Sequence, residues 1–174
     1  CFELMDRAVS HSGGVNLLVN NAAVFRRTSW AEVREESALD EFRINLLAPL
    51  FLIRELAART GRGAVVNLLD RRVAGHAVEA VPYALSKKAL QELTALAALQ
   101  WAPGIRVNAV APGAILPPPD DAAGTAMKKN AARTPLKFNP SPDAVAEAVL
   151  FALRADAMTG QVIFVDAGSH LVAM

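Results

Sequence analysis

The chain has 174 residues, of which 53% are hydrophobic, and its 18 basic and 17 acidic residues leave a net charge of +1. This length and apolar fraction suit one globular domain or part of one, and the near-neutral charge argues against a nucleic-acid partner or an anionic membrane surface. The single cysteine excludes an internal disulfide, three scattered histidines do not suggest a metal site, and no apolar run reaches the ~20 residues of a membrane span. We expect a cytoplasmic protein with a small-molecule ligand.

The hydrophobic pattern predicts alternating helices and strands along the whole chain. The long helix at 35–59 would bury Leu39, Phe42, Ile44, Leu46 and Leu50 on one side. Ser141 is a good N-cap for the last long helix, because Pro142 follows it at the first helical position. The expected helices are 2–9, 35–59, 82–100 and 142–153, the expected strands are 16–20, 64–69, 105–110 and 161–165, and 117–140 is expected to be an irregular region and a mobile lid.

Near-continuous apolar strands separated by helices favour a parallel sheet covered on both faces. Ligands bind beyond the carboxyl ends of the strands in such sheets. Polar or turn-forming residues fall there: Asn21 after the first strand, Asp70 after the second, and Pro112 with Gly113 after the third. Strand ends are common places for polar residues, so the convergence of several at one edge is the more informative observation.

Tyr83 is the only tyrosine of the chain, and Lys87 follows it by four positions. On a helix this spacing places the phenol and the ammonium group on one face. A cation beside a phenol lowers a pKa that starts near ~10, so Tyr83 is a candidate proton donor at neutral pH. The alternative is a helix-surface tyrosine with a solvated lysine, and the surrounding sequence must decide between the two.

Six sequence blocks resemble, in order and spacing, those of the short-chain dehydrogenase/reductase family. The blocks are Leu-Leu-Val-Asn-Asn-Ala-Ala at 17–23, Ile44-Asn45, Val-Val-Asn-Leu at 65–68, Tyr83 with Lys87, Arg-Val-Asn-Ala-Val-Ala-Pro-Gly at 106–113, and 159–168. The resemblance implies an α/β, Rossmann-type doubly wound parallel sheet and an NAD(P)H-dependent oxidoreductase, with NADP(H) as the expected cofactor. The sequence does not choose between NADPH and NADH.

The resemblance also implies roles for individual residues. Lys87 would hydrogen-bond the nicotinamide ribose, and Asn45 would hold a water that connects the site to solvent. The cofactor pocket would be formed by Asn21, Ala22, Tyr83, Lys87, Pro112 and Gly113. The family's glycine-rich turn has no counterpart here, and the chain starts at Cys1 inside a helix-like stretch. We therefore expect residues 1–174 to be the C-terminal part of a single domain that lacks its first βαβ units.

Asp70 stands thirteen residues before Tyr83, where the family usually has its catalytic serine. An aspartate at this position resembles the pteridine reductases and the bacterial dihydromonapterin reductases. Phe25 matches the offset of their ring-stacking aromatic residue, and Pro117 replaces a common family threonine. The resemblance implies reduction of a dihydropterin or dihydrofolate-type C=N bond, with Asp70 passing a proton through Tyr83 and Phe25 stacking on the substrate. Alternatively, Asp70 is a loop residue paired with Arg71 or Arg72, and Phe25 belongs to the core.

Two other functions stay open. One is a carbonyl or alcohol oxidoreductase of the same family, and the other is an inactive truncated fragment or pseudoenzyme, in which strand 16–20 would be an unpaired apolar edge. By resemblance we also expect a homotetramer or homodimer, paired through the helices 35–59 and 82–100. Small residues on the second of these helices would permit close contact: Ala89, Ala95, Ala97 and Ala98.

Overall fold

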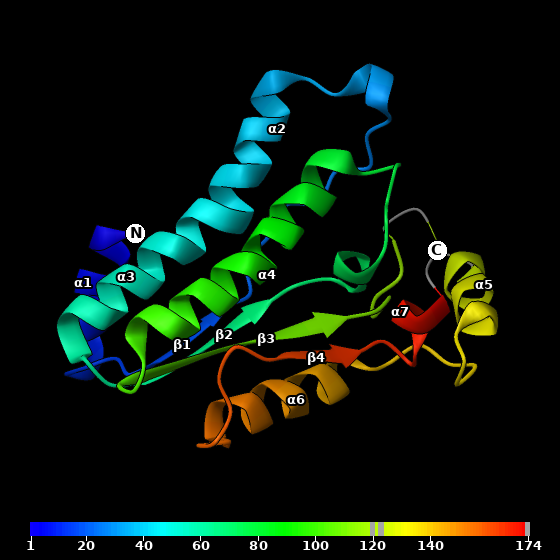
Figure 1. Cartoon of the computed structure of the whole chain (residues 1–174). Coiled ribbons are helices and arrows are strands. Elements are labelled where there is room, and N and C mark those ends of the chain that lie inside the picture. Colours follow the sequence, from blue (N-terminus) through cyan, green and yellow to red (C-terminus); the bar gives the residue numbers. More distant parts are fainter. Residues whose placement is uncertain (119–120, 122–123, 173–174) are drawn as a thin grey trace.

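A computed structural model describes residues 1–118, 121 and 124–172, and its centre is a four-stranded parallel sheet (Figure 1). The strands lie in the order β1-β2-β3-β4, and each pairs in parallel with the next. They are β1 (Leu17–Asn20), β2 (Gly63–Leu68), β3 (Ile105–Pro112) and β4 (Val162–Val165). The predicted α/β class, with a parallel Rossmann-type sheet, is therefore confirmed.

Helices cover both faces of this sheet. On one face lie α3 (Ala48–Thr60) and α4 (Val81–Trp101), and on the other lies α6 (Pro142–Arg154) (Figure 1). The remaining helices are α1 (Phe2–Ser12), which contacts α3, then α2 (Glu35–Phe42), α5 (Thr125–Arg133) and the short α7 (Ser169–Val172). The predicted N-cap of α6 is confirmed, because the Ser141 hydroxyl accepts a hydrogen bond from the Ala144 N–H at 3.1 Å.

The core follows from the alternation of side chains along the central strands. Val65 and Val107 point toward α3 and pack with Ile53 and Leu56. On the opposite face of the sheet, Val66 and Val110 pack against α6. Strands that are buried on both faces need apolar residues at successive positions, which explains the near-continuous runs in the sequence.

At one margin of the sheet, β1 pairs with β2 alone among the described strands. Leu17 and Val19 remain 52% and 41% exposed there. Val19 is the register partner of Val66, so its side chain lies on the α6 side of the sheet. The predicted apolar edge at 16–20 is confirmed for the part of the chain that the structure describes.

The helix predicted at 35–59 is not one regular helix. A π-helical turn, Arg43–Leu47, separates α2 from α3. The predicted buried side is also wrong for Leu39, which is 47% exposed, while Glu41 and Asn45 are almost fully buried. The widened turn shifts the phase of the helix, so a uniform 3.6-residue period cannot describe both halves.

The region predicted to be irregular, 117–140, contains α5, so that prediction is wrong for Thr125–Arg133. The Asp121 carboxylate caps this helix by accepting hydrogen bonds from the N–H groups of Ala126 and Met127. Residues 119–120 and 122–123 lie outside the described residues, and the predicted lid motion stays a prediction.

The four alanines of α4 that were expected to permit close helix contact differ in burial, since Ala89 and Ala95 are only partly buried. Ala97 and Ala98 are buried in the core of this chain and are taken up by packing against the sheet. The outer side of α4 instead exposes Leu85, Leu96 and Leu99, the last at 79%. Among the helices of the described residues, none combines the length and the apolar character that crossing a membrane requires.

Candidate active site

Three polar side chains meet at the carboxyl edge of the sheet. Asp70 follows β2, and Tyr83 and Lys87 lie in the first turns of α4, which packs against β3 and against the 3-10 turn Arg71–Ala74. Tyr83 and Lys87 are 6% and 2% exposed. The four-residue spacing has therefore placed both groups on the inner face of the helix, where they cannot be freely solvated.

The Asp70 carboxylate has two partners. Its Oδ2 accepts a hydrogen bond from the Tyr83 hydroxyl at 3.1 Å, and the same atom lies 2.9 Å from Nη1 of Arg72. Its Oδ1 accepts the Arg72 N–H at 2.8 Å and so caps the 3-10 turn. The predicted pairing of Asp70 with a neighbouring arginine is therefore confirmed for Arg72, and Asp70 also contacts Tyr83. Its role in proton transfer stays a prediction.

Burial, followed by the neighbouring Asp70 carboxylate, raises the pKa of Tyr83 far above its ordinary value. The prediction that Lys87 lowers this pKa is wrong for the structure. The Lys87 ammonium is 5.9 Å from the centre of the Tyr83 ring and donates to the Leu68 carbonyl at 2.7 Å. The charge that acts most strongly on the phenol is therefore negative, and Tyr83 stays neutral at physiological pH.

Lys87 itself is perturbed in the opposite sense. Burial lowers the pKa of its ammonium group to about 8, and the Asp70 carboxylate opposes this effect. A lysine with this pKa is still mostly protonated at neutral pH, which lies only about one pH unit below it. The group combines a positive charge with spare N–H donors, because an ammonium has three and Leu68 accepts one.

Phe25 covers the outer side of the phenol. Its ring centre lies 4.7 Å from that of Tyr83 at an interplanar angle of 77°, an edge-to-face arrangement. The Arg72 guanidinium lies over the Phe25 ring at 5.1 Å from its centre. Phe25 is 46% exposed, so it is not a core residue, and an apolar face remains open beside the proton donor.

The segment that carries Phe25 is tied to the widened turn of the long helix. Asn45, which is fully buried, receives the Val24 N–H and donates to the Val24 carbonyl and to the Ser86 hydroxyl. One turn earlier, Glu41 accepts the Arg26 N–H at 2.9 Å. Asn45 therefore positions the Phe25 segment against α4, and its predicted water-holding role stays a prediction.

A cavity of about 830 Å³ extends from Tyr83 and Lys87 along the α6 side of the sheet. Asn21 and Pro112 line it, as the sequence indicated, but Ala22 and Gly113 are not among its lining residues. Gly113 instead packs against β4: a Cβ atom there would come within 2.9 Å of Asp166. The apolar wall that sequence reasoning missed comes from Ile115, Leu116, Val145, Ala146, Val149 and Leu150.

The residues present fit the nicotinamide end of a dinucleotide. The cavity lies at the carboxyl ends of parallel strands, where such cofactors bind, and its volume falls in the usual range for ligand sites. Lys87 and Tyr83 could hold a ribose hydroxyl, and the apolar wall could hold a flat ring. The fold and the site therefore define a dinucleotide-dependent oxidoreductase.

Comparisons with known proteins agree with this class. A family model described as enoyl-(acyl carrier protein) reductase matches residues 1–170. A protein named as ketoacyl reductase 2 of the granaticin polyketide synthase in Streptomyces violaceoruber is 35% identical over 97% of this chain and 72% of its own length. The chain belongs to the short-chain dehydrogenase/reductase family of NAD(P)H-dependent oxidoreductases.

Two further similar proteins act on pterin-type rings by name. Pteridine reductase 1 of Leishmania tarentolae is 33% identical over 98% of this chain and 68% of its own length. The solved structure of FolM alternative dihydrofolate reductase 1 from Brucella suis, in complex with NADP, matches with a TM-score of 0.91 and 31% identity over 97% of this chain and 69% of that one. The ketoacyl reductase is as similar as these two, so the family is shown and the substrate is not.

Proposed function

We propose that this protein reduces a C=N bond of a dihydropterin or dihydrofolate-type ring with NADPH. The observation that carries the proposal is the hydrogen bond from Tyr83 to Asp70, formed where most of the family has a serine. Phe25, edge-on to Tyr83 and half-exposed, supports it by offering an aromatic face to a flat substrate. The pterin-reducing relatives named above make the same ring chemistry plausible for this chain.

The proposed chemistry needs two additions to the ring. A bound NADPH would supply a hydride to the ring carbon. Tyr83, neutral because its pKa is raised, donates its proton to the adjacent basic nitrogen. The Asp70 carboxylate accepts the phenol hydrogen bond in the resting site. After Tyr83 has given its proton to the substrate, Asp70 would take up a proton from solvent and pass it to the phenolate, which restores the acid for the next turnover.

The same carboxylate disfavours the alternative reaction. Reduction of a carbonyl develops negative charge on oxygen beside Tyr83, and a carboxylate whose Oδ2 lies 3.1 Å from the phenol oxygen would repel that charge. A ring nitrogen is more basic than a carbonyl oxygen, so it can be protonated before or during hydride transfer and then develops little negative charge. The carbonyl or alcohol oxidoreductase remains the second candidate, because Tyr83 and Lys87 would serve it equally and a ketoacyl reductase is among the similar proteins.

The test compares dihydrobiopterin with small ketones in the wild type and in Asp70→Ser and Asp70→Asn. We expect NADPH oxidation with the pterin in the wild type, a loss of at least ten-fold in kcat in both variants, and a gain in ketone turnover in the serine variant alone. A rise in ketone turnover without any loss of pterin turnover would reject the proposal in favour of a carbonyl reductase. Absence of turnover with either substrate would leave the inactive protein as the better description.

We also propose that the protein forms homodimers or homotetramers through α4. Its exposed leucines, Leu85, Leu96 and Leu99, form an apolar row on the outer side of the helix, and such rows commonly mark interfaces. Sedimentation of the wild type and of Leu96→Glu would test this. A monomeric wild type would reject the proposal.

A further inference from the structure

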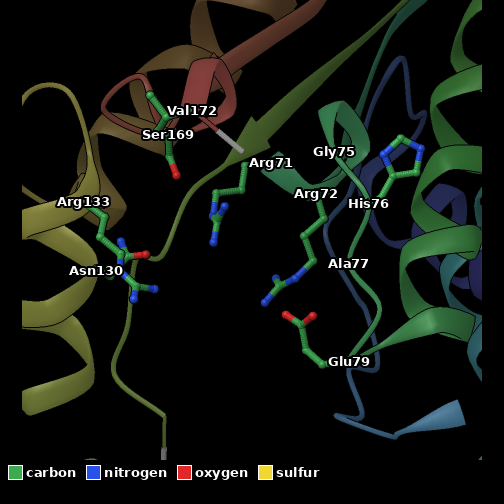
Figure 2. Close-up of a pocket in the computed structure, with 10 residues that line it drawn as sticks. All are labelled: Arg71, Arg72, Gly75, His76, Ala77, Glu79, Asn130, Arg133, Ser169 and Val172. Carbon is green, nitrogen blue, oxygen red and sulfur yellow. The ribbon is translucent and has the colours of Figure 1, made fainter. Parts of the chain in front are cut away.

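A second, smaller cavity lies beside the turn that follows Asp70. Its volume is about 280 Å³. Figure 2 shows that its walls come from the turn after β2, from α5 and from α7. The lining residues that bear charge are Arg71, Arg72, His76, Glu79 and Arg133.

This pocket has an excess of positively charged side chains, with three arginines and one glutamate among its lining residues. Among the described residues Arg72 pairs with Asp70, whereas Arg71 and Arg133 take part in none of the ion pairs found there. Figure 2 shows Arg71 directed into the middle of the cavity, with Arg133 entering from α5, and Glu79 as the carboxylate at its lower end. Two guanidinium groups from separate elements thus border one space, which is the arrangement that binds a carboxylate or phosphate.

Arg72 connects the pocket with the groups of the candidate active site. This residue contacts Asp70 at 2.9 Å and lies over the Phe25 ring, and it also lines the basic pocket. A flat ring that lies against Phe25, within reach of the Tyr83 hydroxyl, would therefore have its outer substituents near Arg72. A space of 280 Å³ falls just below the usual volume for a complete ligand, and it suits a substituent better than a second molecule.

We propose that this basic pocket, formed by Arg71 and Arg133 with His76 and Asn130 at its sides, binds an anionic group attached to the substrate ring. The preferred substrate would be an acidic pterin, such as one with a glutamate tail, rather than a neutral one. The proposal rests on the proposed ring reduction for the position of the substrate. Its anion-binding part stands on the pocket alone.

The kinetic test measures kcat/KM for dihydrofolate, which bears a glutamate tail, and for dihydrobiopterin, whose side chain is uncharged. We expect the wild type to prefer dihydrofolate. Arg71→Gln and the double variant with Arg133→Gln should lower that preference at least ten-fold, mainly through KM, with little change for dihydrobiopterin. Arg62→Gln, which removes the same charge at the opposite edge of the sheet, is the matched control and should behave like the wild type.

A binding test separates failure of this inference from failure of the proposed function. The chain has three histidines, so the ring signals of His76 can be followed by NMR while p-aminobenzoylglutamate, the tail without the pterin ring, is added. We expect a saturable shift of the His76 signals that is lost in the Arg71→Gln, Arg133→Gln double variant. Inorganic phosphate in a parallel titration shows whether a free anion suffices or whether the tail must be present.

The possible outcomes of the two tests distinguish failure of the anion site from failure of the ring chemistry. Turnover of both pterins with equal preference in all variants, or a tail that shifts the His76 signals as much in the double variant as in the wild type, would overturn the basic pocket as an anion site. Failure to reduce either pterin, with an arginine-dependent His76 shift intact, would reject the ring chemistry and leave the anion site standing. Circular dichroism of the variants should show an unchanged fold, because Arg71 is only half-buried and Arg133 is exposed.

Discussion

Tyr83 and Asp70 share a hydrogen bond of 3.1 Å although they belong to different elements and lie thirteen residues apart. The bond joins the first turns of α4 to the end of β2 and places the phenol between a carboxylate and the Phe25 ring. Because the chain has one tyrosine, every property of a tyrosine in this protein reports on the candidate active site.

We expect the phenol of Tyr83 to resist ionisation in the folded protein and to ionise at lower pH in Asp70→Asn. Burial and the Asp70 carboxylate both raise the pKa of Tyr83, and the substitution removes the second cause. The ultraviolet absorption of tyrosinate, followed during alkaline titration, measures this directly. Asp156→Asn, at a side chain 98% exposed, is the matched control, and overlapping curves for wild type and Asp70→Asn would contradict the prediction.

The burial of Lys87 predicts how stability depends on pH. Its pKa falls from 10.5 when unfolded to about 8 when folded, so below pH 8 the wild type bears the full cost of a buried charge, about 3 kcal/mol. Between pH 8 and 10.5 the folded state releases the proton first, and the cost disappears. The free energy of unfolding of the wild type, measured by urea denaturation relative to Lys87→Met, should therefore rise over this window. A difference that stays constant with pH would show that the lysine is not desolvated.

Substitution of Phe25 should weaken substrate binding more than it slows chemistry. Phe25→Leu keeps an apolar side chain but removes the aromatic face, which is worth about 1 kcal/mol in stacked pairs. We expect KM for the pterin to rise five- to ten-fold, with kcat within two-fold of the wild type. Phe2→Leu on α1, at a side chain that is also about half exposed, is the control. A large loss of kcat with unchanged KM would mean that Phe25 acts on Tyr83 rather than on the substrate.

The sheet could be predicted because buried parallel strands leave an unmistakable pattern. The runs around Val65 and Val107 are apolar at successive positions. The helix α6, which follows the second of these strands, has a clear start at Ser141-Pro142. The helix α5 could not be predicted in the same way, since its sequence is polar on most sides. The Asp121 carboxylate and the Asn139 side chain hold it from outside, and such bonds between separate segments leave no periodic signal.

The residues of the candidate site could be predicted in part, because Asn21 and Pro112 line the cavity whereas Ala22 and Gly113 do not. The electrostatics of the site were less predictable. The spacing of Tyr83 and Lys87 indicated a shared face, but it could not show that the lysine ammonium would turn to the Leu68 carbonyl. The pKa directions depend on burial, which no local motif encodes. The adjacent arginines, Arg71 and Arg72, were visible as possible partners for Asp70, whereas their relation to Arg133 depends on how α5 packs.

The buried carboxyl group of Glu41 should act as an anchor for the Phe25 segment. It is 2% exposed and accepts the Arg26 N–H, and burial raises its pKa above the ordinary value. Glu41→Gln retains an acceptor and should melt near the wild-type temperature at pH 7, whereas Glu41→Ala leaves the N–H unpaired and should lose about 1–3 kcal/mol.

The pH dependence of stability provides a second test of the role of Glu41. A raised carboxyl pKa means that the folded state takes up the proton first, so the wild type should gain stability relative to Glu41→Gln as the pH falls through the folded pKa of Glu41 toward 4.5. Thermal melts between pH 4 and 7 would show the trend. If the two proteins diverge in the other direction, Glu41 is stabilised as a carboxylate and the stated cause is wrong.

The π-helical turn at Arg43–Leu47 constrains the length of the chain as well as its shape. Each residue of a regular helix advances the side chains by roughly 100°. Deleting one residue from this turn would restore a regular helix, but it would rotate Glu41 and Asn45 away from Val24 and Arg26 while Ile53 and Leu56 kept their places in the core. A variant shortened by one residue here would thus keep its core and lose the support of Phe25, together with the stability that the buried bonds of Glu41 and Asn45 supply. This turn is therefore a point where insertions and deletions alter activity more than they alter the fold.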